Sequence, residues 1–265
     1  MPQLLGILNV TPDSFSDGGL YARIDRAVDA GLRLLDEGAD WVDVGGESTR
    51  PGSRSVSADE ELSRVLPAIR GILARRPSAQ LSIDTSKAAV AEAAIEAGAR
   101  MVNDVSALRD PAMAAVCAAS GVELILMHMR GQPLDMQSDT VYDDLVGEVC
   151  AQLLARVEVA LEAGVEPGSI RVDPGLGFGK APLDNPQLVA GVPRLAALGY
   201  PVVIGASRKR FIGELTGVAE ARERTAGSIG AALAAAEVGA AMLRVHDVAA
   251  TRHALTVYSA CRGRT

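Results

Sequence analysis

The chain of 265 residues has a formal net charge of −7 and is 48% hydrophobic, which is enough apolar material for a substantial core. Nucleic-acid binding normally needs a basic surface, so this acidic balance argues against a nucleic-acid partner. The three cysteines have neither a paired number nor metal-ligand spacing, and no basic stretch with a long apolar segment follows the N-terminus, so we expect a cytoplasmic protein with no membrane partner.

Eight short apolar segments alternate with longer Ala- and Leu-rich segments along the chain. Buried parallel strands are continuously apolar because both of their faces are covered, and this pattern occurs at residues 4–10, 41–44, 81–83, 101–102, 124–127, 170–172, 202–204 and 242–245. Helical periodicity lies between them, for example at 24–37, 59–75, 88–97, 142–163 and 226–238. Glycines typical of helix ends precede several strands, at Gly38, Gly98, Gly121, Gly164, Gly199 and Gly239. The alternation predicts an α/β fold, a (β/α)8 barrel that forms one domain over residues 1–265.

Each apolar segment ends at a polar or charged residue. Barrels of this kind carry their chemistry on the loops that leave the carboxyl ends of the strands, so these residues are candidates for a site at the barrel mouth. They are Asn9, Asp43, Asp84, Asn103, His128, Asp173, Ser207 and the pair Arg244 and His246.

Two long loops follow the first two predicted strands. Residues 9–19 and 45–57 are rich in Pro, Gly, Asp and Ser. Long surface loops often tolerate insertion without any further role, whereas loops with glycine hinges also serve as lids. Because the two loops leave adjacent strands, we favour a pair of lids over the mouth.

Asp84, Asn103 and Asp173 are expected to converge with Lys209 inside the barrel mouth. Two carboxylates, an amide and an ammonium group suit a flat heterocycle with a guanidine-like edge, because a carboxylate accepts two parallel N–H bonds. Helix capping is the alternative for either aspartate taken singly. Only three basic residues are lysines, and Lys87, Lys180 and Lys209 each come shortly after a predicted strand end.

Arg244 and His246 are two residues apart at the end of the last strand, which places their side chains on one face and indicates an anion site. The Gly-rich segment 173–180 matches neither of the common phosphate-binding loops and is a weak signal alone. His128 lies between two methionines, as a packed histidine does. No group of His, Cys, Asp and Glu has zinc spacing.

Several segments in which these residues occur together resemble those of bacterial dihydropteroate synthases. They run in order from the first predicted strand to the last and cover essentially the whole chain: residues 6–19 (GILNVTPDSFSDGG), 45–52 (GGESTRPG), 82–85 (SIDT), 103–105 (NDV), 127–129 (MHM), 173–180 (DPGLGFGK), 207–209 (SRK) and 244–248 (RVHDV). A set of this length and order is very specific for the family.

The resemblance implies that p-aminobenzoate displaces pyrophosphate from 6-hydroxymethyl-7,8-dihydropterin diphosphate to give 7,8-dihydropteroate. It implies a pterin site of Asp84, Asn103, Asp173 and Lys209, and a diphosphate site of Asn9, Thr49, Arg50, Arg244 and His246. It further implies an aminobenzoate site of Phe15, Pro51, Phe178, Lys209 and Arg210, with Asp17, Arg50 and Lys209 as the catalytic residues. Mg²⁺ on Asn9 is the implied cofactor, and a homodimer packed through barrel helices is the implied assembly.

The sequence departs from the family pattern at Arg210, where many members have Ser, and at Asp184, where His is common. Both residues lie beside the expected aminobenzoate site or its loop, so they affect the expected contacts with the aminobenzoate carboxylate and not the type of reaction. A pterin-binding methyltransferase that uses methyltetrahydrofolate and a corrinoid partner is one alternative, although it needs no diphosphate site. A homologue that binds pterin without turnover and a Schiff-base aldolase built on Lys209 are the others.

Overall fold

The computed structural model describes residues 1–11, 20–49 and 52–263. Its strands are β1 (Gln3–Asn9), β2 (Trp41–Gly45), β3 (Leu81–Asp84), β4 (Met101–Asp104), β5 (Glu123–Met127), β6 (Ile170–Asp173), β7 (Val203–Ile204) and β8 (Met242–Val245). The helices around them are α1 (Leu20–Asp36), α2 (Ala58–Arg75), α3 (Ala88–Glu96), α4 (Met113–Ser120), α5 (Leu145–Glu162), α6 (Asn185–Ala190), α7 (Val192–Ala196), α8 (Arg210–Thr216), α9 (Thr225–Glu237) and α10 (Val248–Cys261).

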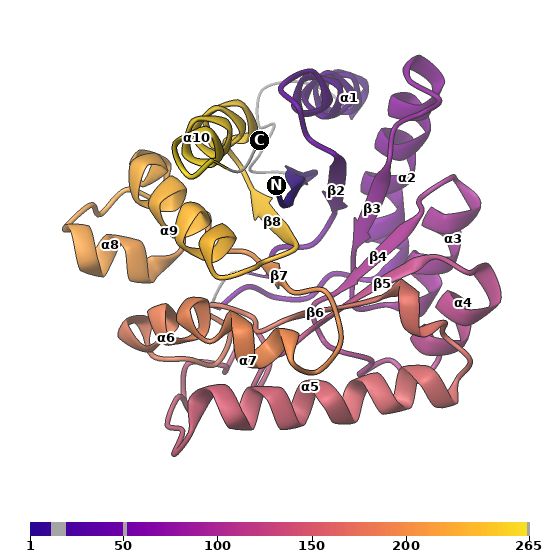
Figure 1. The fold of residues 1–265 in the computed structure, drawn as a ribbon. Helices are drawn as coiled ribbons and strands as arrows, with labels where there is room; N and C mark the ends of the chain where they lie inside the picture. Colours follow the sequence, from indigo (N-terminus) through magenta and orange to yellow (C-terminus); the bar gives the residue numbers. More distant parts are fainter. Residues whose placement is uncertain (12–19, 50–51, 264–265) are drawn as a thin grey trace.

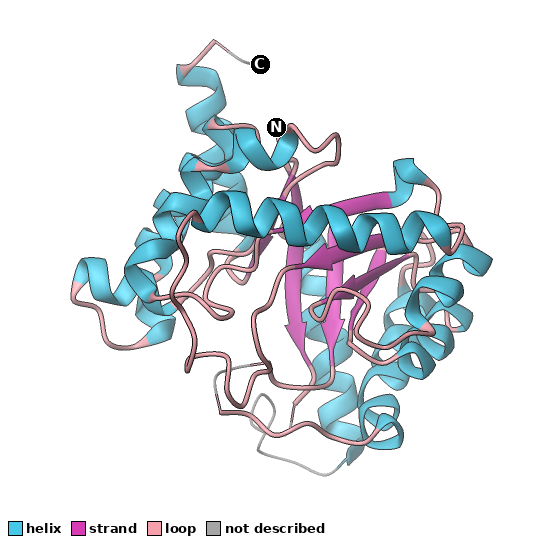
Figure 2. Ribbon diagram, turned by 90° about the horizontal axis from the view of Figure 1, so that it is seen from below, coloured by secondary structure: helices cyan, strands magenta, loops and turns pink. Residues whose placement is uncertain are grey.

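The strands form one parallel sheet in the order β6-β5-β4-β3-β2-β1-β8-β7. A bridge between Val172 of β6 and Val202, directly before β7, joins the two edges, and the Val172 amide donates to the Pro201 carbonyl at 3.0 Å. Helices surround the strands on the outside (Figures 1 and 2). The predicted (β/α)8 barrel is therefore confirmed.

Two apolar layers hold this arrangement. The larger one lies between the strands and the surrounding helices. The smaller one is a buried cluster contributed by six different strands: Leu5, Trp41, Met101, Ile125, Val203 and Met242. These residues lie near the amino ends of their strands and fill the barrel interior there, as barrel side chains do in layers. Ligand binding is thus confined to the opposite, carboxyl end.

The sequence pattern predicted the strands and helices in the right order, but it did not predict where all of them begin and end. The fourth strand extends to Asp104, two residues beyond the predicted apolar pair, so Asn103 lies within a strand. Helix α5 begins at Leu145 rather than at residue 142, because the Asp144 side chain caps it by accepting from the Gly147 amide at 3.1 Å. All six predicted helix-ending glycines have positive φ.

Two strand connections carry more than one helix, with α6 and α7 before β7 and α8 and α9 before β8. None of the helices in the described ranges is both long and apolar enough to cross a bilayer.

Candidate active site

The barrel mouth contains a cluster of buried polar side chains at the carboxyl ends of the strands. Asp84 ends β3, Asp173 ends β6 and Asn103 lies one residue before the end of β4, and each is at most 8% exposed. Asp43, in the middle of β2, is completely buried. Such burial of carboxylates is costly unless each is paired or hydrogen-bonded, so their partners define what the site can bind.

Arg244 of β8 bridges two of these carboxylates. Its Nε donates to Asp43 Oδ2 and its Nη2 to Asp84 Oδ2, both at 2.6 Å. The Asn103 amide donates to the same oxygen of Asp43 at 2.9 Å. Strands β2, β3, β4 and β8 are therefore joined by one polar network across the barrel mouth.

This network corrects two interpretations of the sequence. Asp84 does not cap the helix that follows it, because the first amide of α3, on Ala88, donates to Asp110 instead. Arg244 was assigned with His246 to an anion site alone, but it also contacts Asp84 of the expected heterocycle pocket directly. The reason is that residue 244 faces the barrel interior, where two buried carboxylates need a counter-charge.

The charges of the pocket shift one another's protonation. Burial, with Asp43 and Glu61 nearby, raises the pKa of Asp84 to about 7, and Arg244 opposes this rise. Burial also lowers the pKa of Lys209 to about 8, an effect to which Arg244 adds. Burial raises the pKa of Asp173 above its usual range. Both a carboxyl and an ammonium group in this pocket consequently titrate near neutral pH.

Asp173 and Lys209 complete the pocket on its other side. One oxygen of Asp173 accepts from the Gly175 amide at 2.7 Å, and the other lies so close to Gly205 that a Cβ there would be 3.9 Å from it. The Lys209 ammonium lies 4.0 Å from the centre of the Phe178 ring, a cation–π contact. Phe178 itself packs in a small apolar cluster with Val105, Met127 and Met136.

The Gly-rich loop after β6 is held by a buried lysine. Lys180, 1% exposed, directs its Nζ at three acceptors: His128 Nδ1 and the Phe178 carbonyl at 2.8 Å, and the His128 carbonyl at 3.4 Å. A Cβ on Gly175 would lie 1.9 Å from the His128 carbonyl oxygen, so only glycine permits this approach. His128 is thus a packed histidine whose Nε2 bonds Gln152 at 3.0 Å.

A second group of polar residues lies where β1, β7 and β8 end. Asn9, Arg208 and His246 line one cavity of about 300 Å³, together with residues of β1 and of the C-terminal half of α1 that include Arg33 and, directly after the helix, Glu37. Ser207 Oγ bonds both the backbone amide of His246, at 3.2 Å, and its Nδ1, at 3.0 Å. Burial, with Arg208 and Arg244 nearby, lowers the pKa of His246 to about 3. The imidazole is therefore neutral at physiological pH and can offer an N–H donor to an anion.

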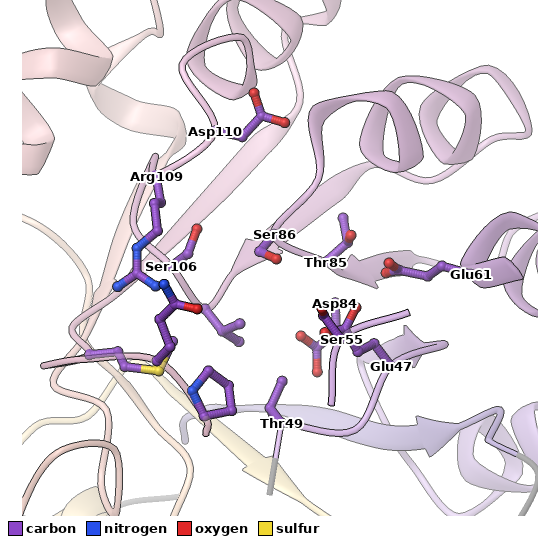
Figure 3. Close-up of a pocket in the computed structure, with 14 residues that line it drawn as sticks. Glu47, Thr49, Ser55, Glu61, Asp84, Thr85, Ser86, Ser106, Arg109 and Asp110 are labelled. Atoms are coloured by element: carbon purple, nitrogen blue, oxygen red, sulfur yellow. The ribbon is translucent and has the colours of Figure 1, made fainter. Parts of the chain in front are cut away.

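Next to Asp84 lies a further cavity of about 220 Å³, drawn in Figure 3. Thr49, Asp84, Thr85, Ser106 and Arg109 are among the residues that line it, together with Glu47 and Glu61. Lys87 pairs with both glutamates and contacts Glu61 Oε2 at 2.6 Å. Since Glu47 belongs to the loop after β2, this ion pair fixes the base of that loop to α2 and to the segment before α3.

The predicted site residues are not all brought together. Thr49 lines the cavity beside Asp84, whereas Asn9 and His246 line the other one. Arg210 is exposed at the start of α8 and pairs with Glu214 four residues later. Phe15, Asp17, Arg50 and Pro51 lie outside the described residues, so their roles stay predictions.

Sequence reasoning missed several residues of the site. Asp43 was noted only as a strand-ending polar residue, Ser207 and Arg208 received no role beyond their place in the segment 207–209, and Glu61 was not noted at all. The small number of lysines was a more useful signal than the polar strand ends, because all three lysines contact a loop at the barrel mouth: Lys87, Lys180 and Lys209.

Comparison with known proteins agrees with this geometry. The pterin binding enzyme family matches residues 5–246. The dihydropteroate synthase of Mycobacterium leprae is 48% identical over 266 residues, which cover 97% of this chain and 93% of the relative. The chain belongs to the dihydropteroate synthase family.

Two solved structures of one member of the dihydropteroate synthase family have the same fold over nearly their whole length. The Xanthomonas albilineans enzyme with 4-aminobenzoic acid has a TM-score of 0.93 and 51% identity, covering 98% of this chain and 93% of that one. Its complex with 7,8-dihydropteroate has a TM-score of 0.90 and 49% identity, covering 98% and 94%. The family predicted from the sequence motifs is confirmed.

Proposed function

We propose that this chain is a transferase that condenses 6-hydroxymethyl-7,8-dihydropterin diphosphate with p-aminobenzoate, giving 7,8-dihydropteroate and pyrophosphate in folate biosynthesis. The observation that carries the proposal is the pairing of a buried carboxylate pocket with an adjacent cavity that offers N–H donors. Arg244 belongs to the first and His246, two residues later on the same strand, to the second. A substrate with a polar heterocycle joined to an anion fits both.

The pterin ring is assigned to Asp84, Asn103, Asp173 and Lys209. One oxygen each of Asp84 and Asp173 takes part in no bond to Arg244 or to Gly175 and is left to accept ligand N–H groups. The Asn103 side chain donates to Asp43 and keeps its carbonyl oxygen as an acceptor. The Lys209 ammonium group can donate a hydrogen bond to a ring nitrogen or to the ring carbonyl.

The diphosphate is assigned to Arg244 and His246, with Asn9, Thr49 and Arg50. A guanidinium group has five N–H donors and Arg244 uses two of them on Asp43 and Asp84, so three remain for an anion. Asn9 ends β1 beside His246 and its amide oxygen is the hard ligand that Mg²⁺ prefers. In the described ranges no three His, Cys, Asp or Glu side chains group as metal ligands. We propose that Mg²⁺ is held by Asn9, diphosphate oxygens and water.

The reaction breaks the C–O bond to the diphosphate and forms a C–N bond to the arylamine. The electron pair of the C–O bond leaves with the diphosphate, and the amine loses a proton after attack. Arg244 and His246 stabilise the leaving charge with preorganised N–H donors, and Mg²⁺, when bound, adds positive charge there. No general base is required of the protein, because the neutral arylamine is the nucleophile.

We assign the aminobenzoate to Phe15, Pro51, Phe178, Lys209 and Arg210. Phe178 and Lys209 are in contact and offer an apolar face beside a cation. Asp17, Arg50 and Lys209 are proposed as the catalytic residues, with Asp17 stabilising the developing cationic carbon. The assembly we propose is a homodimer in the cytoplasm, packed through outer helices that expose Leu215 and Val257.

A pyrophosphate-release assay tests this function. Release from the dihydropterin diphosphate should depend on both p-aminobenzoate and Mg²⁺, with one dihydropteroate formed for each pyrophosphate. Pterin binding without release would indicate a non-catalytic pterin-binding protein. Methyl transfer from methyltetrahydrofolate to a corrinoid partner would contradict the assignment of the diphosphate site.

The affinity for a pterin without the diphosphate is expected to have a narrow pH optimum between about 7 and 8. Below it, Asp84, whose pKa is raised to about 7, is protonated and accepts fewer N–H bonds. Above it, Lys209, whose pKa is lowered to about 8, loses its charge. Calorimetric titration from pH 5.5 to 9.5, corrected for ionisation of the ligand, measures both limbs.

The two limbs should be separable by substitution. Asp84→Asn reduces the acidic limb to the part that comes from Asp173, whose pKa is also raised by burial, and Lys209→Arg removes the alkaline limb because arginine stays charged. A profile that is flat across pH 6 to 9 in the unsubstituted protein would show that neither group binds the ring.

His246→Ala is expected to weaken pyrophosphate binding about tenfold, the value of one hydrogen bond to a charged group. Affinity for a pterin without the diphosphate should stay within about twofold, because His246 lines the other cavity. His253→Ala, on the exposed face of α10, is the matched control. Equal losses for both ligands would place the anion site elsewhere.

A further inference from the structure

The turn after β7, which contains Ser207, is closed by a backbone bond of its own and is held to the end of β8 by an ion pair. The Lys209 amide donates to the Ala206 carbonyl at 3.2 Å and closes the turn. Arg208 has a left-handed backbone, with φ of 60°, and its guanidinium binds Asp247 at 2.7 and 3.2 Å. Asp247 directly follows His246, so Ser207 and His246 face each other with little freedom to move apart.

The directions of the two bonds to Ser207 Oγ follow from the donors available. The His246 backbone amide can only donate, so Oγ accepts that bond. If the ring Nδ1 also donated to Oγ, the hydroxyl proton would need another acceptor, and the described ranges offer Ser207 none. Ser207 is 8% exposed, and a buried O–H without a partner is costly. The hydroxyl proton therefore points to Nδ1, which must be unprotonated.

We propose that Ser207 is a positioning residue that selects the Nε2–H tautomer of His246 and so turns the free ring nitrogen into a donor for the diphosphate. This inference rests on the proposed function of His246 and adds to it. With Nδ1 bound to Ser207, Nε2 is the nitrogen left for a ligand in the cavity that His246 lines with Asn9 and Arg208. Diphosphate oxygens are acceptors only, so the other tautomer would present a lone pair to them and repel them.

Nitrogen NMR of the ligand-free protein, with histidine labelled at both ring nitrogens, tests the tautomer directly. The chain has three histidines, and a His246→Ala sample assigns the signal. We expect the Nε2–H tautomer for His246, a mixture of tautomers in Ser207→Ala, and the native pattern in Ser207→Thr, which keeps the hydroxyl. An Nδ1–H signal in the unsubstituted protein, or an unchanged signal in Ser207→Ala, overturns the proposal.

Ser228→Ala is the matched control for structural damage. The Ser228 hydroxyl accepts from the Arg208 amide at 2.9 Å and donates to the Arg224 carbonyl, so its loss also leaves a backbone amide without an acceptor but does not touch His246. Thermal stability should fall in Ser207→Ala and Ser228→Ala alike, whereas the tautomer should change only in the first.

Pyrophosphate affinity supplies the functional test. Ser207→Ala should weaken it about tenfold, the value of one charged hydrogen bond, and Ser207→Thr should restore it. In a His246→Gln background, where the amide carries its own donor, Ser207→Ala should cause no further loss; an equal loss there would show that Ser207 acts only through the fold. Unchanged affinity in His246→Ala would contradict the anion site itself and leave the NMR result standing.

Discussion

Replacing Asp84 or Asp173 by asparagine is expected to reduce pterin affinity by at least about a hundredfold, which corresponds to about 3 kcal/mol. Each carboxylate accepts charge-assisted bonds from ligand N–H groups, and such bonds contribute about 1.5–3 kcal/mol each. An asparagine either turns its NH₂ group towards the ligand N–H, so that two donors face each other, or turns its carbonyl oxygen there and offers one uncharged acceptor. Asp173→Asn is the cleaner of the two, because its carbonyl oxygen can still accept from Gly175. Calorimetry with a pterin that lacks the diphosphate measures the loss.

Asp40→Asn is the control for this pair. Asp40 precedes β2 at the other end of the barrel, accepts from the Leu4 amide at 2.7 Å and pairs with Arg252. Its substitution should lower thermal stability without changing pterin affinity. Native affinity in both pocket variants would show that the ring lies outside the barrel mouth.

The fold was predictable because the information for it is local. A strand covered on both faces is continuously apolar and a helix end needs glycine, so eight segments and six glycines sufficed to predict the barrel. Segment ends were less predictable, since Asn103 and Asp104 are polar residues inside β4 that an apolar pattern cannot include.

The candidate site could be predicted only in part, because its ion pairs and hydrogen bonds join residues that are far apart in the chain. Asp43 and Arg244 are separated by 201 residues, and nothing near either one indicates the pair. Ser207 and His246 are 39 residues apart, and their two bonds need the turn geometry that Arg208 adopts. Sequence patterns placed the right residue types at the mouth, and the structure shows which of them neutralise one another.

Arg244→Ala is expected to destabilise the protein by about 3–5 kcal/mol, the usual cost of removing one partner from a buried ion pair. Asp43 and Asp84 would be left buried with no guanidinium between them. Pterin and pyrophosphate binding should both weaken, because Arg244 holds Asp84 and also faces the proposed diphosphate. Thermal melts and calorimetry with each ligand measure these losses. Arg171→Ala is the control, since it breaks a partly exposed pair with Glu123 on neighbouring strands and should cost at most about 1 kcal/mol.

A second substitution separates the structural role of Arg244 from its role in binding. Adding Asp43→Asn to Arg244→Ala removes one of the two uncompensated charges and keeps an oxygen that can accept from Asn103. Because desolvation of an unpaired carboxylate is the main cost, the double variant should be more stable than Arg244→Ala alone. Pyrophosphate affinity should not recover, since the donor to the anion is still missing. Equal melting temperatures for the single and double variants would mean that Asp43 is not held as a charged partner, and recovered pyrophosphate affinity would remove Arg244 from the anion site.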